Sequence, residues 1–226
     1  MYFFNTTIFI LLPAIMLTLY AQYKVKTVYT KYSKILAKSG LTGKEVAQEL
    51  LLQNNLRNIK IEPIEGKLSD HYDPRKKKLS LSHEVYYGKS LAAQGIVAHE
   101  IGHAIQDSMN YFPLTIRSNL VPVTNIGSRM AIPLFLIGFL FSLPGLMDIG
   151  IIAFSLAVLF QVVTLPVEFD ASKRAVNLLI KENIISDIEI ISVKKVLNAA
   201  ALTYVAAAAV AVFQLLRLIV LRDRRG

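Results

Sequence analysis

Long uncharged runs alternate with polar sequence along this chain. Four stretches of 18 or more residues contain no Asp, Glu, Lys or Arg: Met1–Tyr23, Met130–Met147, Ile149–Val167 and Val196–Leu216. A helix needs about 20 apolar residues to cross roughly 30 Å of hydrocarbon. Four uncharged core helices of this length would be unusual in a soluble protein of 226 residues. The pattern therefore predicts an α-helical membrane protein with about four transmembrane helices.

The only sizeable polar region, residues 23–129, shows helix and strand signals in turn. Thr42 and Glu45 stand three residues apart before a run of apolar positions, which is a capping-box pattern and predicts a helix. Alternating apolar residues predict one short strand at Ile59–Ile64 and another around Lys77–Ser82. The second strand is also expected to offer an edge to which an extended peptide could add.

Two further elements are expected before the second uncharged run. A helix should begin after Ser90 and continue to about Met109. The segment Tyr111–Pro122 contains two prolines and is predicted to be a connector.

The distribution of basic residues predicts how the spans are oriented. Five lysines directly follow the first uncharged run: Lys24, Lys26, Lys31, Lys34 and Lys38. Five more basic residues follow the third run: Lys173, Arg174, Lys181, Lys194 and Lys195. Because basic loops stay on the cytoplasmic side, we expect the N-terminus outside and residue 24 onward in the cytoplasm. The arginines of the C-terminal tail are an exception, since a fourth span would place them outside.

Composition narrows the possible chemistry. The net charge of +9 is explained by basic loops that stay on the cytoplasmic side and lie against anionic lipid. No nucleic-acid motif accompanies this charge, so no nucleic-acid partner is expected. The chain has no cysteine, which excludes disulfides and thiolate zinc sites. Any metal must therefore be bound by nitrogen and oxygen atoms.

One stretch of the polar region has the spacing of a metal site: VAHEIGHAIQ, Val97–Gln106. His99 and His103 are one helical turn apart, so both imidazoles project from one face and can hold a single zinc ion. Glu100 follows the first histidine and is placed to act as a general base on a metal-bound water. The alternative is a chance pattern in an amphipathic helix, but unpaired polar groups among these apolar neighbours would be costly. The third ligand could be His71, His83 or a carboxylate.

The chain resembles a family of membrane metallopeptidases. AHEIGHAIQ, together with LSDHYDP upstream and LPVEFDAS downstream, is similar to the YugP-like neutral zinc metallopeptidases of bacterial membranes. More distantly, it resembles the HtpX-type and CAAX-prenyl membrane proteases. The resemblance covers nearly the whole chain and implies a gluzincin-like site in which Glu168, after a membrane hairpin, is the third ligand of one zinc ion.

The surroundings of Glu168 differ from the HtpX-type pattern. In that pattern an aspartate four residues after the glutamate supports a histidine ligand, whereas Ser172 stands at the equivalent position here. Asp170 is expected to face elsewhere on the helix. The alternative for Glu168 is an interfacial carboxylate paired with Lys173 or Arg174. His71 or Tyr72 could stabilise an oxyanion, although a structural role in the loop is equally compatible with the sequence.

Taken together with the resemblance, these patterns predict a zinc-dependent membrane endopeptidase with a small α+β, zincin-like cytoplasmic catalytic region. The expected location is the bacterial cytoplasmic membrane, the partners being the bilayer and protein or peptide substrates. The alternative function is a non-enzymatic zinc-binding membrane scaffold. The expected segments are an N-terminal transmembrane anchor (1–23), a cytoplasmic catalytic region (24–129), a transmembrane hairpin (130–167), a cytoplasmic helical segment with the third ligand (168–198), and a C-terminal transmembrane or membrane-packed helix with a basic tail (199–226).

Overall fold

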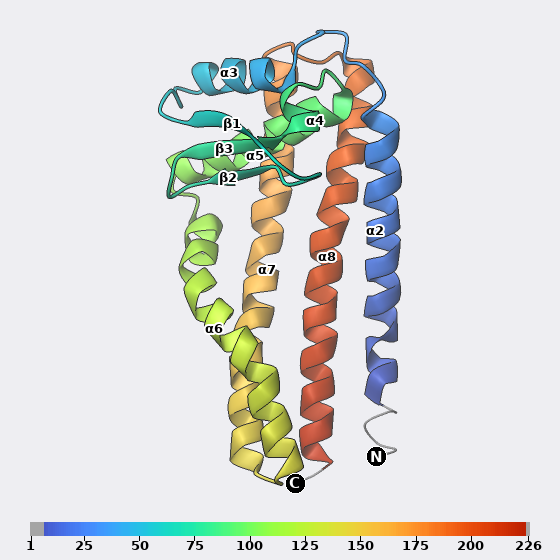
Figure 1. The fold of residues 1–226 in the computed structure, drawn as a ribbon, viewed down its shortest axis with the longest axis vertical. Helices are drawn as coiled ribbons and strands as arrows, with labels where there is room; N and C mark the ends of the chain where they lie inside the picture. Colours follow the sequence, from blue (N-terminus) through green and yellow to red (C-terminus); the bar gives the residue numbers. More distant parts are fainter. Residues whose placement is uncertain (1–6, 225–226) are drawn as a thin grey trace. The chain divides into compact units, whose positions relative to one another are not determined.

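The computed structural model describes residues 7–224, so the first six residues of the predicted anchor and the last two of the tail lie outside the described residues. The chain forms two compact units. The first contains the chain up to Gln22, Thr115–Pro166, and the chain from Thr203 onward; the second contains Tyr23–Leu114 and Val167–Leu202. Figure 1 shows the elements of both units along the chain.

Long helices dominate the described chain, which confirms the prediction of a mostly helical protein. Four helical segments are long and apolar enough to cross a membrane: η1 with α2 (Thr7–Leu11 and Leu12–Tyr32), α6 (Phe112–Leu140), α7 (Pro144–Lys181) and α8 (Asp187–Asp223). Each of them contains one of the predicted uncharged runs or most of it. The four expected spans are therefore present as helices.

The prediction of a connector at Tyr111–Pro122 is wrong, because α6 already begins at Phe112. Pro113 lies in the first turn of the helix, where a missing backbone N–H leaves no hydrogen bond unmade. Pro122 lies inside the helix and removes one such bond. In an apolar helix of 29 residues this loss does not end the element.

The first unit is closely packed where α6 turns into α7. A Cβ atom added at Gly150 would lie 2.8 Å from the backbone nitrogen of Phe135, so the two helices approach closely at this glycine. The guanidinium of Arg222, near the end of α8, forms a two-pronged ion pair with Asp148 at 2.8 and 3.1 Å. One of the exceptional tail arginines is therefore paired with an acidic residue at the start of α7.

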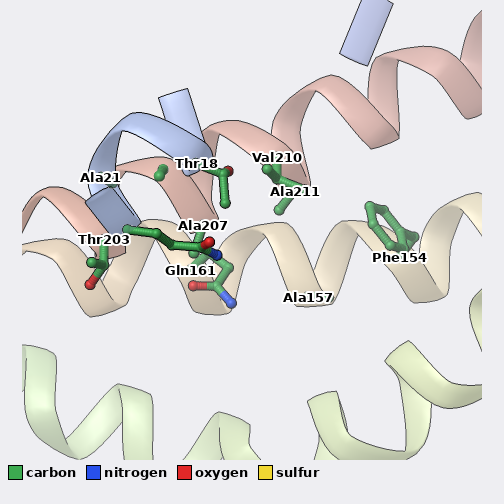
Figure 2. A pocket seen from close by; sticks show the side chains of 11 residues that line it. Thr18, Ala21, Phe154, Ala157, Gln161, Thr203, Ala207, Val210 and Ala211 are labelled. Carbon is green, nitrogen blue, oxygen red and sulfur yellow. The ribbon is translucent and has the colours of Figure 1, made fainter. Parts of the chain in front are cut away.

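The first unit also contains a cavity of about 530 Å³ between α2, α7 and α8. Figure 2 shows the polar side chains of Gln161 and Thr18 bordering this space, together with the short side chains of Ala207 and Ala211. The alanines of α8 leave this space open because their side chains are short.

The second unit contains a small mixed sheet of β1 (Lys60–Ile64), β2 (His71–Asp73) and β3 (Lys78–Ser82). The strand order is β1-β3-β2, with β1 parallel and β2 antiparallel to β3 (Figure 1). The prediction that the strand at Lys77–Ser82 has a free edge is therefore wrong, because β3 is paired on both sides and almost fully buried. The short strand β2 is an outer strand instead.

Three helices pack around this sheet in the second unit: α3 (Gly43–Gln53), α4 (His83–Tyr86) and α5 (Leu91–Ser108). The capping box of α3 is present, since Thr42 Oγ1 accepts from Glu45 N–H while the Glu45 carboxylate accepts from Thr42 N–H. Ser90 caps α5 by accepting from Ala93 N–H at 3.2 Å, as the predicted start of that helix requires. Val97 and Ile101 of α5 are fully buried in the core, which fixes how the helix is rotated.

Candidate metal site

The two histidines of the motif and Glu168 converge in the second unit. His99 and His103 lie on one face of α5, with ring centroids 4.8 Å apart. Glu168 is on α7, and its Oε2 lies 3.3 Å from His99 Nε2 and 3.5 Å from His103 Nε2. The ligand atoms of these three residues all lie within 4.8 Å of one another. The structure therefore brings together the residues that were predicted as metal ligands.

The two distances from Glu168 to the imidazoles are those of atoms that share a zinc ion rather than of a direct ion pair, whereas the three ligand atoms together span 4.8 Å, so the imidazoles would have to move closer to bind one ion. With bonds of about 2.0–2.1 Å, two ligand atoms on a tetrahedral zinc are roughly 3.3 Å apart. A charge-assisted N–H···O hydrogen bond is shorter, at about 2.7–2.9 Å. The separations of 3.3 and 3.5 Å from one carboxylate oxygen to two imidazole nitrogens match the first geometry. Two nitrogens and one oxygen are also a donor set that suits zinc.

Glu168 is held deep in the second unit. Only 1 % of its surface is exposed. A buried carboxylate needs a cation or hydrogen-bond donors to offset the loss of water. The basic residue Arg174 is paired with Asp170 at 2.6 Å rather than with Glu168. The Glu168 carboxylate instead faces the two imidazoles.

Close packing between α5 and α7 allows these residues to meet. A Cβ atom added at Gly102 would lie 2.6 Å from the backbone oxygen of Ala171 and 3.1 Å from its Cα. Neither atom can move without displacing α7. Gly102 in the motif therefore sets the separation between the helix carrying the histidines and the helix carrying Glu168.

We expect Gly102→Ala to lower zinc binding markedly although alanine favours a helix by about 1 kcal/mol. The added methyl group would push the backbone of α7 and hence Glu168 away from His99 and His103. Zinc content of the purified variant, measured by elemental analysis, checks this. The matched control is Gly95→Ala on the same helix, where the nearest atom is a side-chain carbon of Val193 at 3.0 Å that can adjust. Equal zinc contents in the two variants would contradict the role of Gly102.

The outward-facing nitrogen of each imidazole has a hydrogen-bond partner. Ser172 Oγ lies 3.2 Å from His99 Nδ1, and Gln106 Oε1 lies 3.0 Å from His103 Nδ1. A neutral imidazole that binds an ion through Nε2 carries its proton on Nδ1 and can donate it to such an oxygen. Both contacts would orient the rings for binding through Nε2.

Gln106 was not predicted as part of the site. Its amide nitrogen donates to Val167 O and to Asp170 Oδ2, both at 2.8 Å, so it also ties α5 to α7. Its position three residues after His103, on the same helix face, was the available signal. Asp170 does not join the three clustered residues, but the long Gln106 side chain connects it to His103.

Glu100 lies beside the three clustered residues but does not belong to them. Its Oε2 accepts a hydrogen bond of 3.0 Å from the backbone N–H of Tyr72 on β2. Burial raises the pKa of the Glu100 carboxyl, against the opposing influence of His99 and His103. Glu100 thus lies within reach of the cluster and next to an outer strand of the sheet.

The structure places the other candidate residues outside the cluster. His71 is exposed, and its Nδ1 lies 2.8 Å from Ser69 O. The Tyr72 hydroxyl donates to Asp107 at 2.7 Å, and Lys77 pairs with the same carboxylate. His83 is half-exposed beside Glu65. The ligand alternatives His71 and His83 therefore do not converge with His99 and His103.

Comparisons with known proteins match the chain to a zinc metallopeptidase family. A family model described as "Putative neutral zinc metallopeptidase" matches residues 7–223. The "Putative membrane protease YugP" of Bacillus subtilis (strain 168) is 47% identical over 214 residues, which cover 95% of this chain and 95% of that protein. No solved structure matches the chain with statistical significance.

Proposed function

Because this chain belongs to that zinc metallopeptidase family, we propose that it is a membrane-bound endopeptidase with one zinc ion held by His99, His103 and Glu168. The observation that supports this most strongly is the convergence of these three side chains around one point, with Glu100 beside them. Three protein ligands leave a fourth position for water, as catalytic zinc sites commonly do. A purely structural zinc site would not require Glu100.

In this proposal each residue of the site has a separate role in peptide hydrolysis. When bound, zinc lowers the pKa of a coordinated water to about 7 and polarises the scissile carbonyl. Glu100 takes a proton from the attacking water as its oxygen bonds to the carbonyl carbon. Glu100 then gives that proton to the amine nitrogen as the C–N bond breaks. Ser172 and Gln106 hold the imidazoles in the orientation that this geometry needs.

The outer strand β2 offers a place for an extended substrate. One side of β2 pairs with β3, and the N–H of Tyr72 points instead to Glu100 at 3.0 Å. A peptide that added to this edge would have to replace Glu100 as the partner of that N–H or pair with the Tyr72 carbonyl, and it would lie next to the proposed general base. Substrates would accordingly be bound in extended form, and we propose that they are membrane or membrane-proximal proteins.

The test is zinc content of detergent-purified protein, measured beside cleavage of casein with Glu100→Gln as the inactive control. About one zinc per chain and cleavage lost on chelation would support the proposal. Stoichiometric zinc without cleavage of casein or membrane-protein substrates would favour the non-enzymatic scaffold.

We further propose that the protein lies in the bacterial cytoplasmic membrane with its site toward the cytoplasm. Segments 24–129 and 168–198 would be cytoplasmic, and the hairpin 130–167 would cross the bilayer twice. The positive-inside distribution supports this orientation, because Leu143–Asp148, at the start of α7, has no basic residue whereas ten basic residues follow the first and third runs.

Single-cysteine labelling in intact cells checks the orientation, because the chain has no cysteine of its own. Gln53→Cys on α3 and Ile188→Cys on α8 are exposed positions that should be shielded from a membrane-impermeant thiol reagent. Gly145→Cys, in the first turn of α7, should react, since a Cβ atom there meets no other atom within 4 Å. Labelling of all three positions only after lysis, or of Gln53→Cys in intact cells, would overturn this orientation.

A further inference from the structure

A cavity of about 330 Å³ lies between α7 and α8 in the second unit. Apart from Ser172, its polar lining comes from two matching pairs, Lys173 with Asn177 on α7 and Lys194 with Asn198 on α8. Each pair is spaced four residues apart, so both members lie on one face of their helix. No acidic residue lines the cavity. The two helices thus present the same donors, two ammonium groups and two amides, to one space.

The two lysines are not neutralised by the protein. Between residues 7 and 224, neither Lys173 nor Lys194 has an ion-pair partner, whereas their neighbour Arg174 pairs with Asp170 at 2.6 Å. Two ammonium groups that border one cavity repel each other. An anion between them would remove this repulsion and accept hydrogen bonds from both lysines and both asparagines.

The cavity is apolar at one end and polar at the other. Phe169 lies two residues after the third uncharged run, and Ala201 lies inside the fourth, which begins at Val196. Lys173 follows Val167, the last residue of the third run, by six residues, or about 9 Å along a helix. The headgroup region extends roughly 5–7.5 Å beyond the hydrocarbon, and the long Lys173 side chain can reach back into it. The polarity of the cavity therefore changes in the same direction as that of a phospholipid.

We propose that this cavity binds an anionic phospholipid, with the phosphate between Lys173 and Lys194 and the start of an acyl chain against Phe169. Basic pockets between transmembrane helices are suited to anionic lipid headgroups. Ser172 also lines the cavity while its hydroxyl contacts His99, so the bound lipid would lie one side chain away from the metal site. Lipid binding itself does not depend on peptidase activity.

Native mass spectrometry of the full-length protein in neutral detergent tests the proposal with phosphatidylglycerol and, as the zwitterionic comparison, phosphatidylcholine. We expect phosphatidylglycerol to bind at least tenfold more tightly. Each lysine contributes roughly fivefold to such binding, so Lys173→Gln with Lys194→Gln should weaken it about 25-fold. The control, Lys181→Gln with Lys195→Gln, removes the same charge from the same two helices outside the cavity and should change binding less than twofold.

Three outcomes would overturn the proposal. Equal losses in the two double variants would show general attraction to basic helices rather than a site. Equal binding of both lipids would show that the cavity does not distinguish an anionic headgroup from a zwitterionic one. Displacement of phosphatidylglycerol by an equal concentration of inorganic phosphate would identify free phosphate as the ligand. Because all four lysines are exposed and glutamine is a comparable helix former, the variants should fold, which circular dichroism verifies.

Discussion

Replacing Glu100 with glutamine is expected to leave bound zinc unchanged and to slow peptide cleavage by about 10²–10⁴-fold. The amide has nearly the same shape and keeps an oxygen that can accept the hydrogen bond from Tyr72 N–H. It cannot take a proton from the attacking water. Zinc content and cleavage rate, measured on the same preparation, separate binding from proton transfer.

Glu49→Gln provides a matched control for this substitution. It makes the same change from carboxylate to amide on α3, in the same unit, and should cleave at the parental rate. A Glu100→Gln variant as active as the parent would exclude Glu100 as the general base. Loss of zinc together with activity would mean that Glu100 supports the site rather than the reaction.

Glu168→Ala is expected to lose both zinc and activity. Removing a hydrogen-bond partner of a ligand typically weakens metal binding 10–100-fold, so removing a ligand should cost more than about 100-fold. Two histidines alone would hold the ion loosely and fix its geometry poorly. Elemental analysis after dialysis against a weak chelator would measure the difference.

Two further variants on α7 should lose less zinc than Glu168→Ala. Asp170→Ala should retain most of the zinc, because Asp170 reaches His103 only through Gln106. Ser172→Ala should lie between the two, because its hydroxyl contacts His99 Nδ1 directly at 3.2 Å. If Glu168→Ala binds zinc as tightly as the parent while Asp170→Ala loses it, the third ligand is misassigned.

Features set by neighbouring residues were predictable from the sequence. The capping box at Thr42 and the start of α5 at Ser90 depend on hydrogen bonds between residues three positions apart, and both are present. Apart from the turn at residues 141–143, the described parts of the uncharged runs form helices as expected, because their length and composition are sufficient signals. Prolines were misleading in α6, since the cost of a proline depends on its place in the helix and on the apolar length around it.

Features set by packing between distant segments could not be predicted in the same way. The central position of β3 depends on β1 and β2 pairing with both of its sides. Asp170 is two residues from Glu168 and points in a different direction from the helix, as its spacing indicates. Its link to His103 arises because Gln106 extends across from α5, and nothing near Asp170 in the sequence reveals that. Resemblance to a family suggested Glu168, which spacing alone left among several candidates.

The order of the proposed ligands along the chain has a consequence for biosynthesis. Glu168 follows His103 by 65 residues, and two uncharged runs lie between them. On the ribosome, α5 is therefore complete before the residues that close its metal site have been made. If the hairpin inserts into the bilayer as proposed, Glu168 can meet the histidines only after that insertion. Until then a nascent chain would lack the third ligand, and proteolytic activity could arise only after the hairpin has been made and inserted.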